Sequence, residues 1–227
     1  MAEQATSSNS EKLALNRRDV LAWAGAAATM GAAQVMATPA SSAFRVSDLV
    51  MVDAITLADA IRSRQVSCVE VMTAYLDHIE KLNPKVNAIV ALQDRAALLA
   101  QASARDAQLA RGELMGPLHG FPHAVKDLAL VKGIKTTFGS PILKDFVPPT
   151  DSIMVERLRR AGAIFIGKTN TPEFGLGSHT YNPVYGVTRN AYDQTRSAGG
   201  SSGGGCRFAR AADVACSRWQ RLWRQSP

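Results

Sequence analysis

The sequence predicts a layered α/β fold, and two observations lead to this prediction. Along residues 56–166, segments with apolar side chains at helical spacing alternate with short runs rich in β-branched and aromatic residues. The chain of 227 residues is 46% hydrophobic and 20% charged, which is ordinary for a soluble globular protein with one substantial core. Alternation of this kind is typical of a sheet that packs against helices.

Two helices are predicted first, over residues 56–64 and 67–82. Each opens with a capping box, in which a Ser or Thr is followed three residues later by an acid, namely Thr56 with Asp59 and Ser67 with Glu70. The second segment also has an apolar stripe at helical spacing, made of Val69, Met72, Leu76, Ile79 and Leu82. Proline cannot continue a helix in the usual way, so Asn83-Pro84 is expected to end it.

The remaining elements continue the alternation. Strands are predicted over the apolar and β-branched runs at residues 86–92, 121–125 and 163–166. An alanine-rich helix is predicted over residues 94–111, ending at Gly112, and another over residues 151–161. The strand at 163–166 is apolar on both faces, so we expect it to be buried.

Candidate chemistry lies in two segments. In the stretch Ser197-Ala-Gly-Gly-Ser-Ser-Gly-Gly204, glycine pairs bracket two serines, giving a backbone that bends freely and leaves two hydroxyls uncovered. Upstream, Lys126 lies in an apolar run between Val125 and Leu128, which favours burial. A buried lysine beside a glycine-framed serine is a plausible base and proton relay for acyl transfer. A surface ion pair of Lys126 with Asp127 is the alternative.

Four ordered motifs carry a family resemblance: residues 118–127 (LHGFPHAVKD), 167–173 (GKTNTPE), 188–190 (TRN) and 199–204 (GGSSGG). With these motifs the chain resembles the amidase signature family of serine amidohydrolases, over about residues 52–205. The resemblance implies one large mixed sheet with helices on both faces, of which the N-terminal part is present. It also implies hydrolysis of a carboxylic amide C–N bond in a small-molecule substrate, and it allows a homodimer of the full-length protein.

The catalytic set of that family consists of a lysine, a serine preceded by a cis peptide bond, and a second serine that attacks the carbonyl. The resemblance places the lysine at Lys126 and the cis-peptide serine at Ser201. It implies no metal ion and no organic cofactor. The attacking serine of the family lies 24 positions after the cis-peptide serine, where this chain has Gln225. The triad is therefore incomplete, and we expect this chain to be inactive.

The last 22 residues, 206–227, differ in character from the rest. They contain five arginines, no lysine, one acid, two of the three cysteines and two of the three tryptophans. Their apolar residues follow neither a helical nor a strand period. This segment supplies much of the net charge of +7 and the pI of about 9.6, whereas residues 44–205 have no strong charge bias. We interpret the tail as translated out of frame.

The genetic code supports this interpretation. Trp219 and Trp223 have a single codon, TGG, which becomes a glycine codon when translation starts one nucleotide later. In that frame, codons permitted for residues 217–226 can spell Ala-Asp-Gly-Ser-Asp-Phe-Gly-Gly-Ser. Its last serine falls at position 225, where the family has its nucleophile. A frameshift near residues 205–210 that truncates a longer amidase accounts for the tail.

The N-terminal segment, residues 1–43, is expected to be an export signal. Arg17 and Arg18 precede an uncharged, alanine-rich run over residues 20–37, followed by small residues with candidate cleavage points at Ala40 and Ala43. Paired arginines before a mildly hydrophobic core are typical of a twin-arginine signal, so we expect a periplasmic or cell-envelope location in a bacterium. A membrane anchor is the alternative, but the run is short and weakly hydrophobic, so no stable anchoring is expected.

Two other functions stay open. A basic exported nucleic-acid-binding protein could use the arginines and tryptophans of the tail, although out-of-frame translation of that segment predicts no nucleic-acid partner. The subunit that amidates glutamyl-tRNA shares the same motifs, but tRNA charging is cytoplasmic, which conflicts with an export leader.

Several tempting motifs are not assigned a function. Gly162–Thr169 matches the phosphate-binding pattern GxxxxGKT, but its interior is strand-like and Asn170-Thr171-Pro172 follows instead of a helix. The four histidines are expected to be structural, without metal-ligand partners, and these are His78, His119, His123 and His179. Cys68 is expected to be an inert packing residue, and no disulfide framework is available.

The frameshift interpretation makes a prediction about the coding DNA. A one-nucleotide correction after the codon of Gly204 should restore a Gly-Ser-Asp-x-Gly-Gly-Ser stretch and an open frame of several hundred codons. Sequencing the coding DNA across this position and beyond the stop codon measures this directly. A stop codon soon after the correction, in every frame, would contradict the interpretation.

Overall fold

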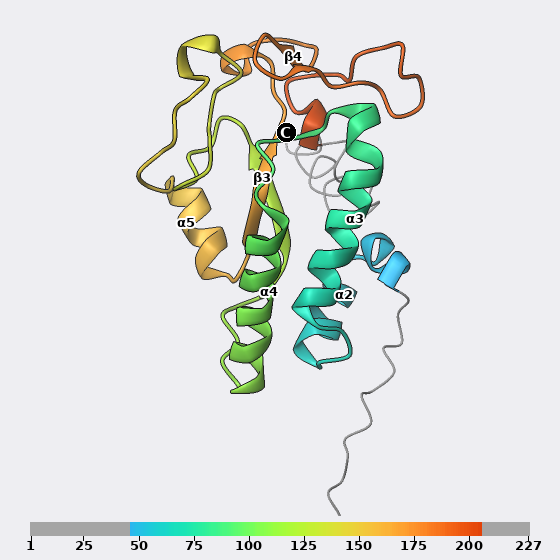
Figure 1. The fold of residues 1–227 in the computed structure, drawn as a ribbon, viewed down its shortest axis with the longest axis vertical. Helices are drawn as coiled ribbons and strands as arrows, with labels where there is room; N and C mark the ends of the chain where they lie inside the picture. The colour runs from blue at the N-terminus through green and yellow to red at the C-terminus, as the bar shows by residue number, and fades with distance from the viewer. Residues whose placement is uncertain (1–45, 206–227) are drawn as a thin grey trace, which may run out of the picture. The chain divides into compact units, whose positions relative to one another are not determined.

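The computed structural model describes residues 46–205. The predicted export leader (1–43) and the predicted out-of-frame tail (206–227) lie outside the described residues. The described residues form an α/β arrangement (Figure 1). Its helices are α2 (Ala54–Arg62), α3 (Cys68–Val86), α4 (Arg95–Ala110) and α5 (Ile153–Arg160), with short 3-10 turns η1 (Val46–Met51), η2 (Pro141–Leu143) and η3 (Glu173–Gly175). Its strands are β1 (Ile89–Val90), β2 (Pro122–Lys126), β3 (Ile164–Thr169), β4 (Tyr181–Asn182) and β5 (Gly186–Val187).

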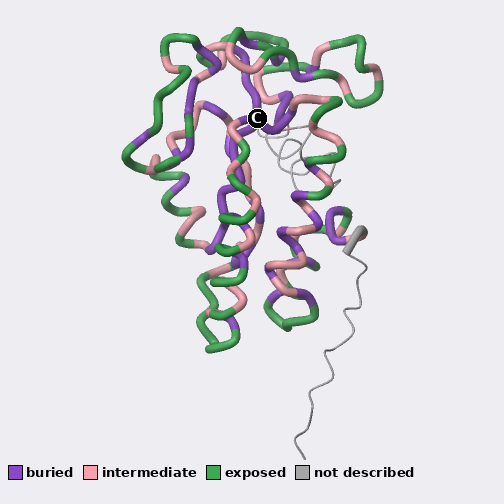
Figure 2. The backbone as a smooth tube through the Cα atoms, in the orientation of Figure 1, coloured by how far each residue is buried: buried purple, intermediate pink, exposed green. Residues whose placement is uncertain are grey.

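The main sheet is mixed, with the strand order β1-β3-β2. β3 runs antiparallel to β1 and parallel to β2, and every residue of β3 is buried (Figure 2). The register of β2 on β3 shifts between His123 and Ala124, so that Ile166 has no partner in β2. β4 and β5 form a separate two-stranded sheet.

Helices cover both faces of the main sheet. Ile164 and Ile166 of β3 join the larger hydrophobic cluster, which contains the apolar stripes of α2, α3 and α4. Phe165, which points to the other face, joins a second cluster with Val155 of α5. The prediction of a mixed sheet with helices on both faces is therefore confirmed.

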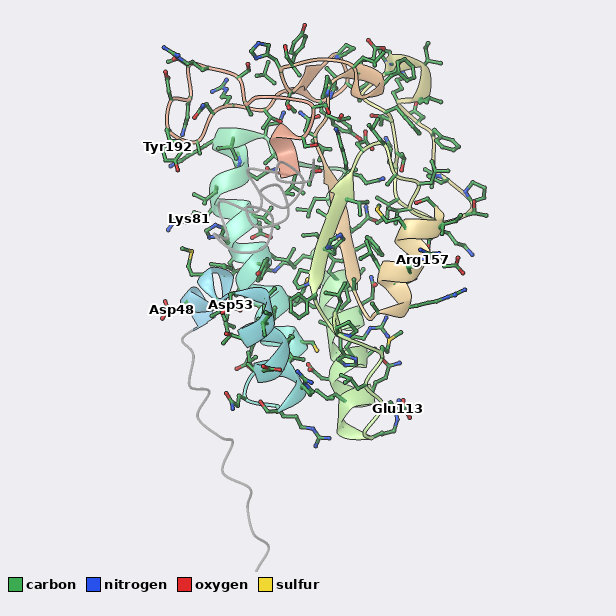
Figure 3. All side chains as sticks on the ribbon, turned by 180° about the vertical axis from the view of Figure 1, so that it is seen from behind. Asp48, Asp53, Lys81, Glu113, Arg157 and Tyr192 are labelled. Atoms are coloured by element: carbon green, nitrogen blue, oxygen red, sulfur yellow. The ribbon has the colours of Figure 1, made fainter. Side chains whose placement is uncertain are left out.

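The start of α2 differs from the prediction. The helix begins at Ala54, and its N-cap is Asp53, labelled in Figure 3, whose side chain accepts hydrogen bonds from the amides of Ile55 and Thr56. The Thr56–Asp59 capping box was wrong, because Thr56 already lies inside the first turn and donates its own hydroxyl to Asp53 at 2.6 Å. The Ser67–Glu70 box at the start of α3 is confirmed in both directions.

The end of α3 was also placed too early. The helix runs through Pro84 to Val86 and ends at Asn87, whose φ of 50° is left-handed. Asn83 turns the chain into β1, because its side-chain Oδ1 accepts from the amides of Ala88 and Ile89 at 2.9 and 2.8 Å. The predicted strand at 86–92 is therefore reduced to Ile89–Val90, since Val86 belongs to α3, Asn87 caps that helix, and Ala91 is left-handed.

The other predicted elements are present with adjusted ends. α4 begins after its N-cap Asp94, and α5 is shorter than predicted at each end. β2 and β3 extend further than predicted, to Lys126 and Thr169. In the described part of the chain, no helix combines the length and the apolar character needed to cross a membrane.

The role of Asn83 leads to a stability prediction. Asn83→Ala removes two acceptor bonds and the donor bond from Asn83 Nδ2 to Ile89 O, so the free energy of unfolding should fall by about 1–3 kcal/mol. Urea unfolding of the 227-residue chain measures this. Lys81→Ala is the matched control, because Lys81 is exposed on the same helix (Figure 3), and its effect should stay within about 0.5 kcal/mol. Equal effects of the two substitutions would contradict the assignment.

Candidate active site

The two predicted site residues lie in contact. Lys126 is the last residue of β2, and its Nζ donates hydrogen bonds to Ser201 Oγ at 2.8 Å and to Ser202 Oγ at 3.2 Å. All three side chains are half-buried. The alternative of a surface ion pair with Asp127 is excluded, because the Asp127 side chain is completely buried. The structure thus brings a lysine amine and two serine hydroxyls to the end of the main sheet.

The serines lie in a tightly packed loop. The Gly200–Ser201 peptide bond is cis, as the family resemblance implied. The amide of Gly200 donates to Ser178 O at 2.6 Å, and Thr171 Oγ1 donates to Ser201 O at 3.4 Å. The loop is therefore held by backbone and side-chain bonds from the segment that follows β3.

The glycines of this loop serve a different purpose from the one predicted. Gly200, Gly203 and Gly204 do not have a left-handed φ. A Cβ at Gly204 would lie 2.4 Å from the backbone nitrogen of Asn170, and one at Gly200 would lie 2.8 Å from His179 N. Real Cβ atoms do not approach other atoms so closely. These glycines are needed because the loop packs directly against neighbouring backbone, so the prediction of a freely bending loop was wrong.

Buried asparagines and threonines form hydrogen bonds beside the serine loop. Asn182 Nδ2 donates to Asn170 Oδ1 and to Thr171 O, each at 2.7 Å, and Asn170 Nδ2 donates to Thr188 Oγ1 at 3.0 Å. Thr188 Oγ1 in turn donates to Asn87 O at 2.6 Å, at the end of α3. A hydrogen-bonded network of buried side chains therefore joins α3, β3 and the serine loop, and such a network is costly to break.

A second polar group lies on the α5 side of the sheet. The carboxylate of Asp127 accepts hydrogen bonds from the hydroxyl of Thr137 at 2.6 Å and from the amide of Thr137 at 3.1 Å. Burial raises the pKa of Asp127. Lys168 is also completely buried, and its Nζ donates to the carbonyl of Ala129. Burial lowers the pKa of Lys168 to about 8, while the charge of Asp127 opposes the shift. No role was predicted for Lys168 from the sequence; the buried apolar run before it was the available signal.

His119, His123 and Cys68 are packed within the fold, away from Lys126 and the two serines. His119 is buried, accepts the amide of Met115 at Nδ1 and contacts Arg105 O through Nε2 at 3.0 Å. His123 meets the edge of the Phe165 ring, and burial lowers its pKa. Burial likewise raises the pKa of the Cys68 thiol, which keeps it protonated. Within residues 46–205 no three His, Cys, Asp or Glu side chains gather as metal ligands would.

A polar cavity of about 290 Å³ adjoins the serine loop. It is lined by residues of the segment 172–183, among them Glu173, Ser178 and His179. Ser178 and His179 both contact the loop, through Gly200 and through the bridge of His179 with Gly199. The predicted nucleophile position, 225, lies outside the described residues. Within the described residues, the candidate site consists of Lys126, Ser201 and Ser202, none of which lines this neighbouring cavity.

Comparison with known proteins decides the family. A sequence model of the family described as Amidase matches residues 70–216, more than half of the chain. The chain belongs to the amidase family.

Individual relatives agree with this family assignment. Over 158 residues it is 47% identical to a subunit of the glutamyl-tRNA(Gln) amidotransferase of Acidothermus cellulolyticus, covering 70% of this chain and 31% of that protein. Among solved structures, the peptide amidase of Stenotrophomonas maltophilia matches with a TM-score of 0.62 and 34% identity, over 67% of this chain and 32% of that one. Fatty acid amide hydrolase matches with a TM-score of 0.69 and 26% identity, over 74% and 29%. The chain spans about a third of the length of these relatives.

Burial of Lys168 predicts that the free energy of unfolding depends on pH. The pKa of Lys168 is about 8 in the folded chain and 10.5 when exposed, so between these values only the unfolded chain binds the proton. The contribution of Lys168 to the free energy of unfolding should therefore rise from pH 8 to pH 10.5. We expect the stability of the wild-type chain relative to Lys168→Met to increase over this window in urea titrations. Lys144→Met, at an exposed lysine, should show a constant difference, and a constant difference for Lys168→Met would contradict the prediction.

Proposed function

We propose that the chain carries the proton-relay half of a serine amide hydrolase. The observation that carries this proposal is the 2.8 Å contact of Lys126 Nζ with Ser201 Oγ, in a chain of the amidase family. In the proposed reaction, neutral Lys126 accepts the proton of Ser201, and Ser201 accepts the proton of the attacking serine. Half-burial of Lys126 supports this role, because desolvation favours the neutral amine.

The remaining steps follow from acyl transfer. The attacking serine oxygen forms a bond to the amide carbon, the C–N bond breaks, and the amine leaves with the proton returned through the relay. Water then hydrolyses the acyl-enzyme to the carboxylic acid. The substrate class is a small-molecule amide, and the mechanism needs neither a metal ion nor an organic cofactor.

The nucleophile separates the proposed family chemistry from the chain itself. Position 225 is a glutamine, whose amide cannot attack a carbonyl as a serine does. By the family resemblance, the oxyanion donors belong to the same downstream stretch and are replaced as well. We therefore propose that the 227-residue chain is inactive and that the frame-corrected protein is the hydrolase.

A second candidate function is that of an amidotransferase component. Identity of 47% to a subunit of a glutamyl-tRNA(Gln) amidotransferase favours it. The export leader predicted at residues 1–43 favours a periplasmic hydrolase instead, since tRNA charging is cytoplasmic. Hydrolysis of simple aliphatic or aryl amides without a partner protein would support the hydrolase, whereas turnover only of glutamine with added partner proteins would support the amidotransferase.

The proposal predicts a clear activity pattern. The 227-residue chain should release no amine from simple amides, and the frame-corrected protein should do so. In the corrected protein, Lys126→Ala and Ser201→Ala should each lower kcat by about 10²–10⁴-fold, because each interrupts the proton relay. Lys144→Ala, at an exposed lysine, is the control and should retain full activity. Amine release can be followed by coupled ammonia or chromophore assays.

Two outcomes would contradict the proposal. Full activity of Lys126→Ala in the corrected protein would remove the lysine from the mechanism. Labelling of Ser201 or Ser202 in the 227-residue chain by a serine-directed fluorophosphonate would show that one of these serines is itself the nucleophile.

A further inference from the structure

Three buried residues form a closed ring of backbone hydrogen bonds beside the serine loop. The amide of Thr180 donates to Ala198 O at 3.0 Å, that of Ala198 to Thr188 O at 2.7 Å, and that of Thr188 to Thr180 O at 2.9 Å. The three residues are almost completely buried and come from three separate passes of the chain, around β4 and β5 at one end of the main sheet (Figure 1). We call this group of Thr180, Thr188 and Ala198 the ring.

The ring is attached to the main α/β layers through Thr188. Its hydroxyl donates to Asn87 O, the cap of α3, and accepts from Asn170 Nδ2, directly after β3. The next residue, Arg189, also donates its amide to Val86 O at 2.9 Å. The position of the ring is therefore set by the ends of α3 and β3, which are packed in the core.

The ring contacts the serine loop through Thr180. Thr180 Oγ1 donates to Gly199 O at 3.2 Å and accepts from the amide of Gly203 at 3.0 Å. A hydroxyl has one proton and two lone pairs, so it can make both bonds at once. Gly199 and Gly203 flank the cis Gly200–Ser201 bond and Ser202, and thus one side chain holds both ends of the segment that contacts Lys126.

The contact with Thr180 leaves no room for a side chain at Gly203. A Cβ at this position would lie 2.4 Å from Thr180 Oγ1 and 2.8 Å from Ala198 Cβ. The close approach explains why this position is glycine even though its φ is not left-handed. The contact therefore needs a hydroxyl at position 180 and a residue without a side chain at position 203.

We propose that Thr180 is a positioning residue that holds the segment 199–203, and thereby Ser201, against Lys126. It touches no reacting atom and acts through the backbone of Gly199 and Gly203. Its importance for turnover rests on the function proposed above, whereas its control of the loop does not.

The test uses hydrogen–deuterium exchange of the 227-residue chain, followed by mass spectrometry of peptides. Thr180→Val keeps the shape of the side chain but loses both bonds, so exchange in the peptide covering residues 197–205 should rise about tenfold while exchange in β3 stays unchanged. Thr180→Ser keeps the hydroxyl and should exchange like the wild type. Thr136→Val is the matched control, because Thr136 is equally buried and, among residues 46–205, its hydroxyl donates to the nearby carbonyl of Ile134 rather than to the serine loop.

Unchanged exchange in residues 197–205 of Thr180→Val would overturn the proposal. An increase spread equally over β3 and the loop, in both Thr180→Val and Thr136→Val, would also overturn it, because it would show a merely structural role. If Thr180→Val does not fold, Gly203→Ala tests the same contact from the other side, and it should raise exchange in the same peptide.

A kinetic measurement on the frame-corrected protein separates this inference from the proposed function. Thr180→Val should lower kcat at nearly unchanged KM, and Thr180→Ser should restore it. If exchange changes as expected but Lys126→Ala leaves amide hydrolysis intact, then the proposed function fails while the positioning of the loop by Thr180 stands. If Lys126→Ala abolishes hydrolysis while Thr180→Val leaves both exchange and kcat unchanged, the positioning role fails and the proposed function stands.

Discussion

The parallel pairing of β2 with β3 is the constraint on which the site depends. β3 is buried along its whole length, so its backbone groups must find partners in β1 and β2. The register that satisfies them sets Lys126 opposite Thr169. The chain after Thr169 then passes the end of β2, and its side chains hold the serine loop within reach of Lys126. The site follows from how the buried strand satisfies its hydrogen bonds.

Close packing, rather than flexibility, characterises the serine loop. Glycines allow its backbone to lie directly against that of Asn170 and His179, and buried asparagines and threonines provide the bonds that this proximity requires. An unpaired buried polar group costs about 1–3 kcal/mol, so such a network favours one arrangement over its neighbours. The proton relay proposed for Lys126 and Ser201 benefits from this, because proton transfer depends on a short and constant separation.

Local sequence signals predicted the elements well where the interactions are local. The Ser67–Glu70 capping box, the alanine-rich helix after Asp94 and the buried strand before Gly167 are all present. The predictions were wrong at two ends of helices, where the side chain of a neighbouring residue accepts backbone amide hydrogen bonds that the pattern did not assign to it. Asp53 takes the cap of α2 from Thr56, and the Asn83 side chain makes the bonds that allow α3 to run past Pro84 and turn directly into β1.

The sequence by itself determined the layered α/β fold, the family resemblance and the identity of Lys126 and Ser201, because these depend on periodicity and on short ordered motifs. Only the tertiary structure decided their contact across 75 residues, the role of Thr180 and the position of Lys168. The shift of register before Ala124 leaves Ile166 without a partner, and Lys168 pairs with Val125 and bonds to Ala129 on the α5 face. Strict alternation along β3 would instead set Lys168 on the face of Ile164 and Ile166. Such a shift depends on how two distant strands pack together, which no local pattern records.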